Sequence, residues 1–190
     1  VAAELRSSGY LFINRGHRSI SEKISDAVNG WEQLRKGKEI TGAVARKIYS
    51  YMSTKDRVKR GFKTLTAVED TDFVTLETLT ADHGLLATQD MVWHIAMDRV
   101  PESDRAYIIA MLRRGERFNG EPRITVSTIH GAKGGEADNV VLFTDLSPAA
   151  EEQMNVNPDD THRVFYVGVT RAKQSLFIVE PQDFTRSYDL

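Results

Sequence analysis

The sequence predicts an α/β fold, in which an open parallel sheet flanked by helices is interrupted by a mainly helical insertion. Three observations lead to this prediction. Residues 139–144 form a continuous apolar run, as expected of an interior parallel strand, and residues 175–179 form another. A segment with helical spacing, 159–169, lies between them, so a strand–helix–strand order results. Residues 36–119 lack such strands and have mainly helical patterns, which predicts the insertion.

Composition narrows the class of protein. The chain has 190 residues, of which 41% are hydrophobic and 27% charged, so it can form a globular core. The net charge is only −2, and any contact with nucleic acid must therefore come from a local patch. There is no cysteine, and no two of the five histidines have ligand spacing, so we expect no disulfide and no structural zinc. No membrane span or signal segment is visible, which favours a cytoplasmic protein.

The N-terminal part begins the predicted sheet. Residues Tyr10–Asn14 (YLFIN) are apolar enough for a short buried strand, and the polar turn RGHRS follows. Ser19 or Ser21 then caps a predicted helix that runs to about Gly30. Because the chain starts without methionine and reaches a strand almost at once, we expect it to be part of a longer protein.

The middle of the chain is predicted to be helical. Helices are expected over about 43–52, 89–99 and 103–114, with Pro101 separating the last two. Residues 54–63 (TKDRVKRGFK) contain five basic side chains and form the only concentrated positive run. Two interpretations stay open for this run, a solvated helix face and a DNA-facing patch.

The stretch RITVSTIHGAKGGEADNVVLF combines a predicted strand over 124–129, a polar loop and the strand over 139–144. Glycines let a backbone approach a ligand or adopt positive φ, and hydroxyl, imidazole, ammonium and carboxylate groups supply donors and acceptors. A loop after a strand of an open α/β sheet is where ligands collect. The alternative is a glycine-rich crossover with solvated charges, because short glycine patterns are weak signals. The polar side chains in question are Thr128, His130, Lys133 and Glu136, and the glycines are Gly131, Gly134 and Gly135.

Two arginines, Arg15 and Arg171, lie beside the ends of predicted strands. Guanidinium groups bind phosphate oxygens through two parallel hydrogen bonds. Two such groups at one anion would stabilise the charge on a transferring phosphoryl group. For either arginine alone, a surface ion pair is the simpler interpretation.

The longer patterns resemble conserved motifs of the UvrD/Rep family of superfamily 1 DNA helicases. VSTIHGAKGGEADNVVLF resembles the fifth motif, and RVFYVGVTRAKQSLFIV resembles the sixth. YLFINRGHRS is similar, more loosely, to the fourth motif, a strand that ends in arginine. The resemblance implies the second of two RecA-like lobes, formed by residues 1–35 and 120–190, with 36–119 as a reduced counterpart of the family's inserted subdomain.

The resemblance also implies a role for each matching residue. Arg171 and Arg15 would reach the γ-phosphate of ATP, and Glu136 would lie near the ribose. Thr128 and His130 would contact the backbone of single-stranded DNA, or of DNA at a single/double-strand junction. Lys133 and Gly134 would belong to the loop that couples the two ligands, and Lys133 in AKG favours 3′-to-5′ movement.

The sequence also departs from the family pattern. Gly135 and Ala137 flank the motif glutamate where leucine and phenylalanine are common, which weakens the expected ribose contact of Glu136. The chain contains no G-x-x-x-x-G-K-[ST] loop and no D-E-x-x pair for magnesium. ATP and Mg²⁺ are therefore expected to be held mainly by an N-terminal lobe, and the chain alone is expected to be inactive. Two alternatives remain, a DNA-binding or scaffolding module without motor activity and an unrelated α/β nucleotide-binding domain.

Overall fold

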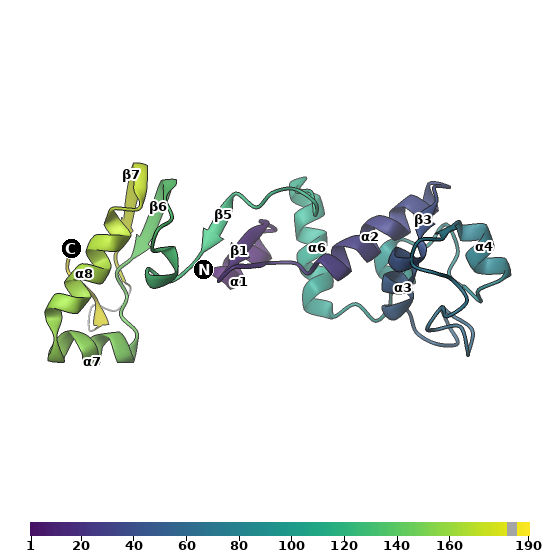
Figure 1. Ribbon diagram of the computed structural model, residues 1–190, viewed down its shortest axis with the longest axis horizontal. Helices are drawn as coiled ribbons and strands as arrows, with labels where there is room; N and C mark the ends of the chain where they lie inside the picture. Colours follow the sequence, from purple (N-terminus) through teal and green to yellow (C-terminus); the bar gives the residue numbers. More distant parts are fainter. Residues whose placement is uncertain (182–185) are drawn as a thin grey trace. The chain divides into compact units, whose positions relative to one another are not determined.

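The computed structural model describes residues 1–181 and 186–190, and the chain divides into two compact units. Unit 1 is Val1–Thr125 and unit 2 is Val126–Leu190. The structure contains helices together with small parallel and antiparallel sheets (Figure 1), so the predicted α/β class is confirmed. None of the described helices is long and apolar enough to cross a membrane. The family resemblance predicted a different division: a lobe formed by 1–35 and 120–190, and an insertion over 36–119. The compact units do not test that division, which stays a prediction.

Unit 1 begins with helix α1 (Ala2–Ser7), strand β1 (Phe12–Asn14) and strand β2 (His17–Arg18). Helix α2 (Glu22–Arg35) follows, and the Ser21 side chain accepts a hydrogen bond from the Ile24 amide, so of the two predicted caps, Ser19 and Ser21, the second is the cap. Strand β3 (Ile40–Thr41) and helix α3 (Gly42–Ser50) come next. Helices α2 and α3 pack against each other, and Trp31, Leu34 and Ile48 are buried in the core of this unit.

The rest of unit 1 is less helical than predicted. It contains β4 (Phe73–Val74), α4 (Leu76–Ala81), α5 (Trp93–Ala96) and α6 (Glu102–Arg114). Strands β3 and β4 pair antiparallel, and the helix expected over 89–99 is only the four residues of α5. The helix expected over 103–114 is α6, and it ends at Gly115 in the left-handed conformation that favours glycine. Residues 54–63 form turns rather than a helix, so the proposed helix face was wrong.

The predicted strand after Tyr10 is present, but the turn after it is tighter than expected. Strands β1 and β2 pair antiparallel, with Asn14 opposite His17, so Arg15 and Gly16 form a two-residue hairpin loop. Both have positive φ, 49° for Arg15 and 84° for Gly16, as a type I′ turn requires. Strand β5 (Ile124–Val126) lies on the other side of β1, and the sheet order is β2–β1–β5.

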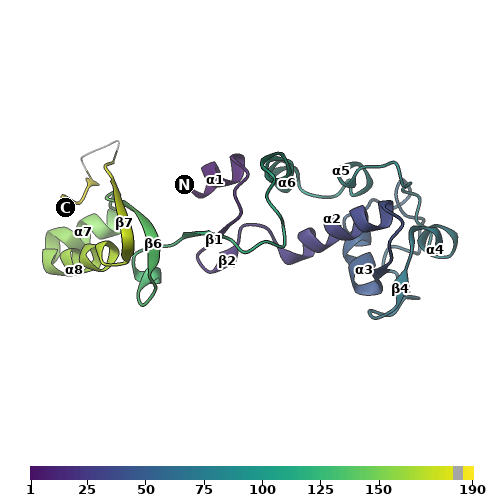
Figure 2. The same ribbon diagram turned by 90° about the horizontal axis from the view of Figure 1, so that it is seen from above.

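Unit 2 contains the C-terminal segment, with its helices against a pair of strands (Figures 1 and 2). A 3₁₀ turn η1 (His130–Ala132) precedes strand β6 (Ala137–Phe143). Helices α7 (Pro148–Val156) and α8 (Pro158–Val169) and strand β7 (Ala172–Val179) follow. Strands β6 and β7 pair in parallel, and α8 contacts both of them.

The parallel pair confirms the order strand–helix–strand but not the predicted interior strands. Leu142 is the one residue of β6 that is buried, and Val141 and Phe177 are each 55% exposed. Within the described residues the sheets have two or three strands and are of mixed direction, so the structure does not show a large open parallel sheet. Helix α8 packs closely on β6 at Gly168. A Cβ added at this glycine would lie 3.1 Å from Leu142 Cδ1.

Candidate nucleotide- and nucleic-acid-facing site

The polar loop between β5 and β6 folds on itself through local hydrogen bonds. The Thr128 hydroxyl accepts a hydrogen bond from the Gly131 amide at 3.1 Å, and the Ala132 amide donates to the Thr128 carbonyl at 3.1 Å. This Thr-initiated turn follows the end of β5 at Val126, so the strand predicted over 124–129 was too long. Thr128 and His130 therefore lie in a turn that their own residues stabilise, rather than at a strand end.

The second half of the loop is open. Gly134 has φ +83°, and no atom lies within 4 Å of a Cβ built there. Lys133 and His130 are not buried, and within residues 1–181 and 186–190 no hydrogen bond or ion pair is found for either side chain. These side chains are consequently free to contact a ligand that approaches the loop. The arrangement has the features expected of a ligand-facing loop.

Arg171 holds the end of this loop. It follows the C-terminus of α8, where Thr170 is the C-cap, and its Nη1 donates to the Gly135 carbonyl at 3.1 Å. Its Nε donates to the Val167 carbonyl at 3.0 Å and its Nη2 to the Thr170 hydroxyl at 3.0 Å. In the backbone, the Ala137 amide donates to the Arg171 carbonyl at 3.0 Å. The structure thus joins Arg171 to the loop through direct hydrogen bonds.

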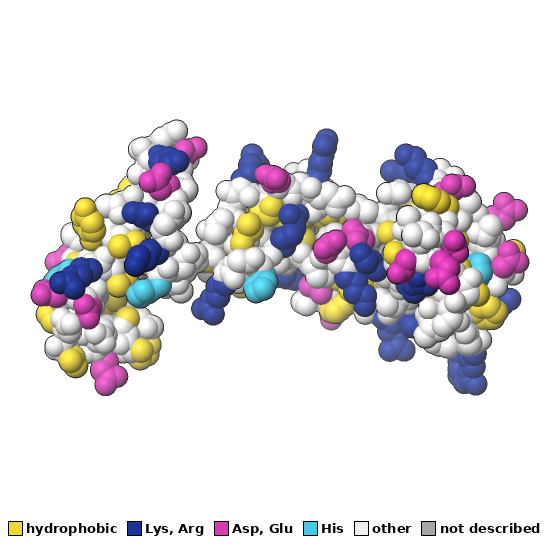
Figure 3. Space-filling view, viewed as in Figure 1, with side chains coloured by type: hydrophobic (Ala, Val, Ile, Leu, Met, Phe, Trp, Pro, Cys, Tyr) yellow, Lys and Arg dark blue, Asp and Glu magenta, His cyan; other side chains and the backbone are white. Residues whose placement is uncertain are grey.

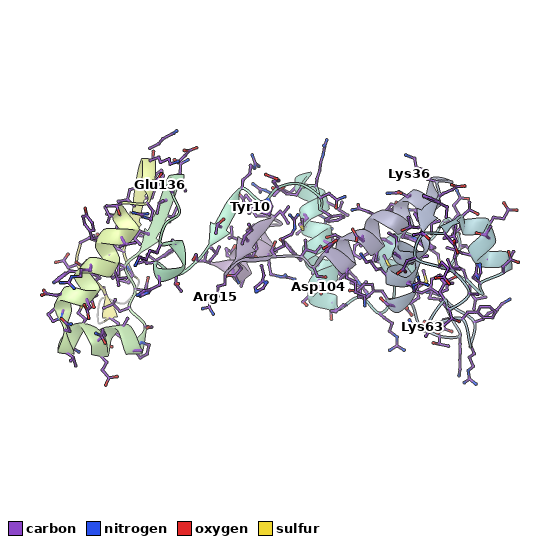
Figure 4. All side chains as sticks on the ribbon, viewed as in Figure 1. Tyr10, Arg15, Lys36, Lys63, Asp104 and Glu136 are labelled. Atoms are coloured by element: carbon purple, nitrogen blue, oxygen red, sulfur yellow. The ribbon has the colours of Figure 1, made fainter. Side chains whose placement is uncertain are left out.

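An ion pair makes a second connection between the same two segments. Lys173 Nζ lies 3.3 Å from Glu136 Oε2, and both side chains are 55% exposed. Figure 4 shows Glu136 beside the start of β6. An exposed pair of this kind contributes little to stability, on the order of 0–1 kcal/mol, but it favours one position of the carboxylate. Lys173 and Thr170 are the two site residues that sequence reasoning missed. Both are in VTRAKQ, but only the fold shows their partners.

Arg15 belongs to unit 1 and is described there on its own. It is exposed at the tip of the β1–β2 hairpin, and Figure 4 shows its side chain projecting away from β1. The other arginine of this stretch, Arg18, is differently placed. Its Nη2 donates to the carbonyls of Phe118 and Gly120 at 2.8 and 2.9 Å, so it ties the hairpin to the segment after α6.

The remaining donors and acceptors leave capacity for a ligand. A guanidinium has five N–H donors, and three of those of Arg171 are used by Val167, Gly135 and Thr170. Two remain for an anion such as a phosphate. Glu136 uses Oε2 in its ion pair, and its Oε1 can accept a hydrogen bond from a hydroxyl group. Within residues 1–181 and 186–190, no group of three or more His, Asp or Glu is arranged to hold a metal ion.

An arginine with free donors beside a glycine-bearing loop, in an α/β unit, is an arrangement whose chemistry suits a phosphate group. Residues 105–182 match the family model of the UvrD-like helicase C-terminal domain. This range includes the 128–136 loop and Arg171. This match supports the resemblance of this part of the chain to UvrD-like helicase C-terminal domains, and it suggests a helicase motor-domain role. No curated protein and no solved structure matched the chain.

Proposed function

We propose that the chain is the second RecA-like lobe of an ATP-dependent DNA helicase that moves 3′-to-5′ along single-stranded DNA in the cytoplasm. The observation that best supports this proposal is the hydrogen bond from Arg171 to Gly135, since it joins the sixth-motif segment to the fifth-motif loop. One ligand-facing loop is thereby physically linked to one phosphate-competent arginine. Thr128, His130 and Lys133 are proposed to contact the DNA backbone, from the first half of that loop.

ATP with Mg²⁺ is proposed to be held mainly by an N-terminal lobe, because the 190 residues contain no phosphate-binding lysine loop. When ATP is bound, negative charge develops around its γ-phosphoryl group in the transition state of hydrolysis. Arg171 would point its two remaining N–H groups at that charge, and Arg15 would do the same from its hairpin. Glu136 Oε1 would accept a hydrogen bond from the ribose, and Gly134 would let the loop backbone come close.

The proposal divides hydrolysis between two lobes, so the isolated chain should have none. We expect the purified 190-residue chain to fold, as judged by circular dichroism, and to show no ATP turnover with or without single-stranded DNA. The control is the same chain joined to the ATP-binding lobe, which should hydrolyse ATP and respond to DNA. DNA-stimulated turnover that copurifies with the isolated chain through several columns, and disappears in Arg171→Ala, would contradict the two-lobe proposal.

A module that keeps the fold but has lost the motor remains the second candidate. It predicts DNA binding by the joined protein without ATP turnover. The absence of an intact phosphate-binding loop in that protein would favour it, whereas an intact loop would count against it.

A further inference from the structure

The basic residues of the 54–63 segment divide into two sets. Lys63 is turned inward, and its Nζ donates to the carbonyls of Tyr49, Ser50 and Met52 at the end of α3. Arg57 Nε donates to the Ile95 carbonyl at 3.0 Å. These two therefore hold the segment in place. A second set remains at the surface, where the described part of the chain supplies no ion pair or side-chain hydrogen bond to any of its members: Lys55, Lys59 and Arg60.

Two further cations lie around Lys63, from distant parts of the chain. Lys23 is in the first turn of α2, with its Nζ 5.1 Å from the centre of the Tyr51 ring. Arg99 follows α5, and its amide donates to the Tyr51 carbonyl at 2.9 Å. Burial lowers the pKa of Lys63, and the nearby positive charges of Arg99 and Lys23 lower this pKa further. Lys63 is thus close enough to both of these cations for their charges to act on it.

One nearby carboxylate, Asp98, offsets part of this positive charge. Asp98 raises the pKa of Lys63, but its Oδ1 accepts a hydrogen bond from the Ser53 amide at 2.7 Å. In the described part of the chain, no carboxylate forms an ion pair with Lys23, Lys63 or Arg99. An excess of adjacent like charges destabilises a compact fold. A bound anion would remove this repulsion.

The imbalance of charge extends over unit 1. Residues 1–125 carry 20 basic and 17 acidic side chains, whereas residues 126–190 carry 5 basic and 10 acidic ones. A chain with net charge −2 therefore has a unit with net charge +3. Figure 3 shows Lys and Arg side chains protruding from the part of unit 1 that contains α3 and α4. Such a local excess is the electrostatic signature of polyanion binding.

We propose that this basic surface, made of Lys23, Lys55, Lys59, Arg60 and Arg99 around Lys63, binds the phosphate backbone of a nucleic acid. It is a second nucleic-acid contact, separate from the 128–136 loop, because all of its residues belong to unit 1.

Backbone recognition fits this surface because its exposed groups are mainly cations, and both nearby aromatic rings already have a contact within the chain. Gly84 approaches the Phe62 ring so closely that an added Cβ would lie 2.7 Å from it. Tyr51 is half-buried, and Lys23 lies over its ring. Phe62 is still 39% exposed, so the preference for the backbone rests on the exposed cations, and binding should depend on charge and on salt.

The test measures binding of the 190-residue chain to a fluorescent blunt duplex and to a single strand of equal length, by anisotropy at several salt concentrations. Neutralising Lys59 and Arg60 together (K59Q/R60Q) should weaken binding at low salt. It should also lower the slope of log K against log salt by roughly 1.8 for a duplex, or about 1.4 for a single strand, since each phosphate contact adds about 0.9 or 0.7. A second pair, K23Q/R99Q, should act in the same direction.

The matched control is Lys36→Gln with Lys38→Gln (K36Q/K38Q), which removes the same charge from exposed positions of unit 1. Figure 4 shows Lys36 and Lys63 on opposite sides of the unit. The control should keep both the affinity and the salt slope. Thermal melts of all variants separate weakened binding from unfolding.

Equal affinities and slopes for K59Q/R60Q and the control would overturn the proposal. A poly-glutamate peptide that competes as well as the duplex, at equal charge, would also overturn it in favour of an acidic protein partner. Greater loss with the duplex than with the single strand would identify the duplex as the ligand, and the reverse would identify the single strand. Because no ATP is present, these outcomes do not depend on the proposed motor site.

Discussion

Replacing Arg171 by alanine should abolish most ATP turnover in a protein that joins this chain to the proposed ATP-binding lobe. An arginine that stabilises the transferring phosphoryl group contributes about 10³ to 10⁵ in rate. We therefore expect kcat to fall by about that factor, with little change in affinity for single-stranded DNA, because the contact acts on charge that develops in the transition state. Steady-state ATPase assays and DNA anisotropy on the same preparation measure both quantities.

Controls separate this role from a structural one, since Arg171 also binds Val167, Gly135 and Thr170. Arg171→Lys keeps the charge but loses the planar donors, and should recover only a part of the rate. Thr170→Val removes the hydroxyl that accepts from Arg171 Nη2, so kcat should fall while KM changes little. Thr170→Ser keeps a hydroxyl there, so kcat and KM should both stay near their original values. Ordinary ATPase activity in a folded Arg171→Ala protein would contradict the assignment.

The role of Arg15 follows the same logic and has a built-in comparison. Arg15→Ala should lower turnover without loss of stability, because its side chain is exposed and no partner is found for it among the described residues. Arg18→Ala should destabilise unit 1, because it loses two hydrogen bonds to the segment after α6. A loss of turnover in Arg18→Ala but not in Arg15→Ala, at equal stability, would move the proposed role from Arg15 to Arg18.

Replacing Gly9 by alanine should have a large effect on stability. Gly9 has φ +73°, and an added Cβ would lie 2.5 Å from the Ala110 carbonyl group in α6. Left-handed backbone costs an L-residue about 1–2 kcal/mol, and forced overpacking costs about 1–3 kcal/mol more. We expect a loss of roughly 2–5 kcal/mol in free energy of unfolding, against a usual total of about 5–15 kcal/mol. Urea unfolding of the chain measures it.

The matched control is Gly37→Ala. Gly37 has φ +72°, nearly the same as Gly9, but no atom lies within 4 Å of its built Cβ. It should lose only the backbone part of the effect. Equal losses at Gly9 and Gly37 would show that the contact of the N-terminal segment with α6 contributes nothing, despite the 2.6 Å hydrogen bond from Tyr107 Oη to the Tyr10 carbonyl.

Local signals were the ones that could be predicted from the sequence. The Ser21 cap and the start of α8 at Pro158 depend on neighbouring residues, and both are present. The end of β5 was also a local matter, because the Thr128 turn uses a residue three positions away, but β-branched residues obscured it. The two-residue hairpin at Arg15 was missed because a non-glycine residue occupies positive φ there.

Long-range partners could not be predicted in this way. Lys173 and Glu136 meet only because β6 and β7 pair in parallel, with Ala137 opposite Ala172. In the same way, the carbonyls that Lys63 binds are supplied by the end of α3, so a run that reads as five equivalent cations divides into internal and surface sets. The family motifs identified the candidate residues, and the fold shows which of them touch.

The loop offers a short physical route between the two proposed ligands. His130 lies in the η1 turn, which leads through Gly134 to Gly135, and the Gly135 carbonyl accepts a hydrogen bond from Arg171. DNA that moves His130 would therefore move an acceptor of the arginine proposed to reach the phosphate. Such a route makes each ligand sense the other.

The central claim, that this loop couples DNA to ATP hydrolysis, is tested most directly by one ratio in His130→Ala of the joined protein. The ratio is DNA-stimulated ATP turnover divided by basal turnover, measured beside a thermal melt. The account predicts that the ratio falls toward one while the basal rate and the melting temperature stay near wild type, because His130 is exposed and need not touch the phosphates. An equal loss of both rates in a destabilised protein would contradict it, as would an unchanged ratio.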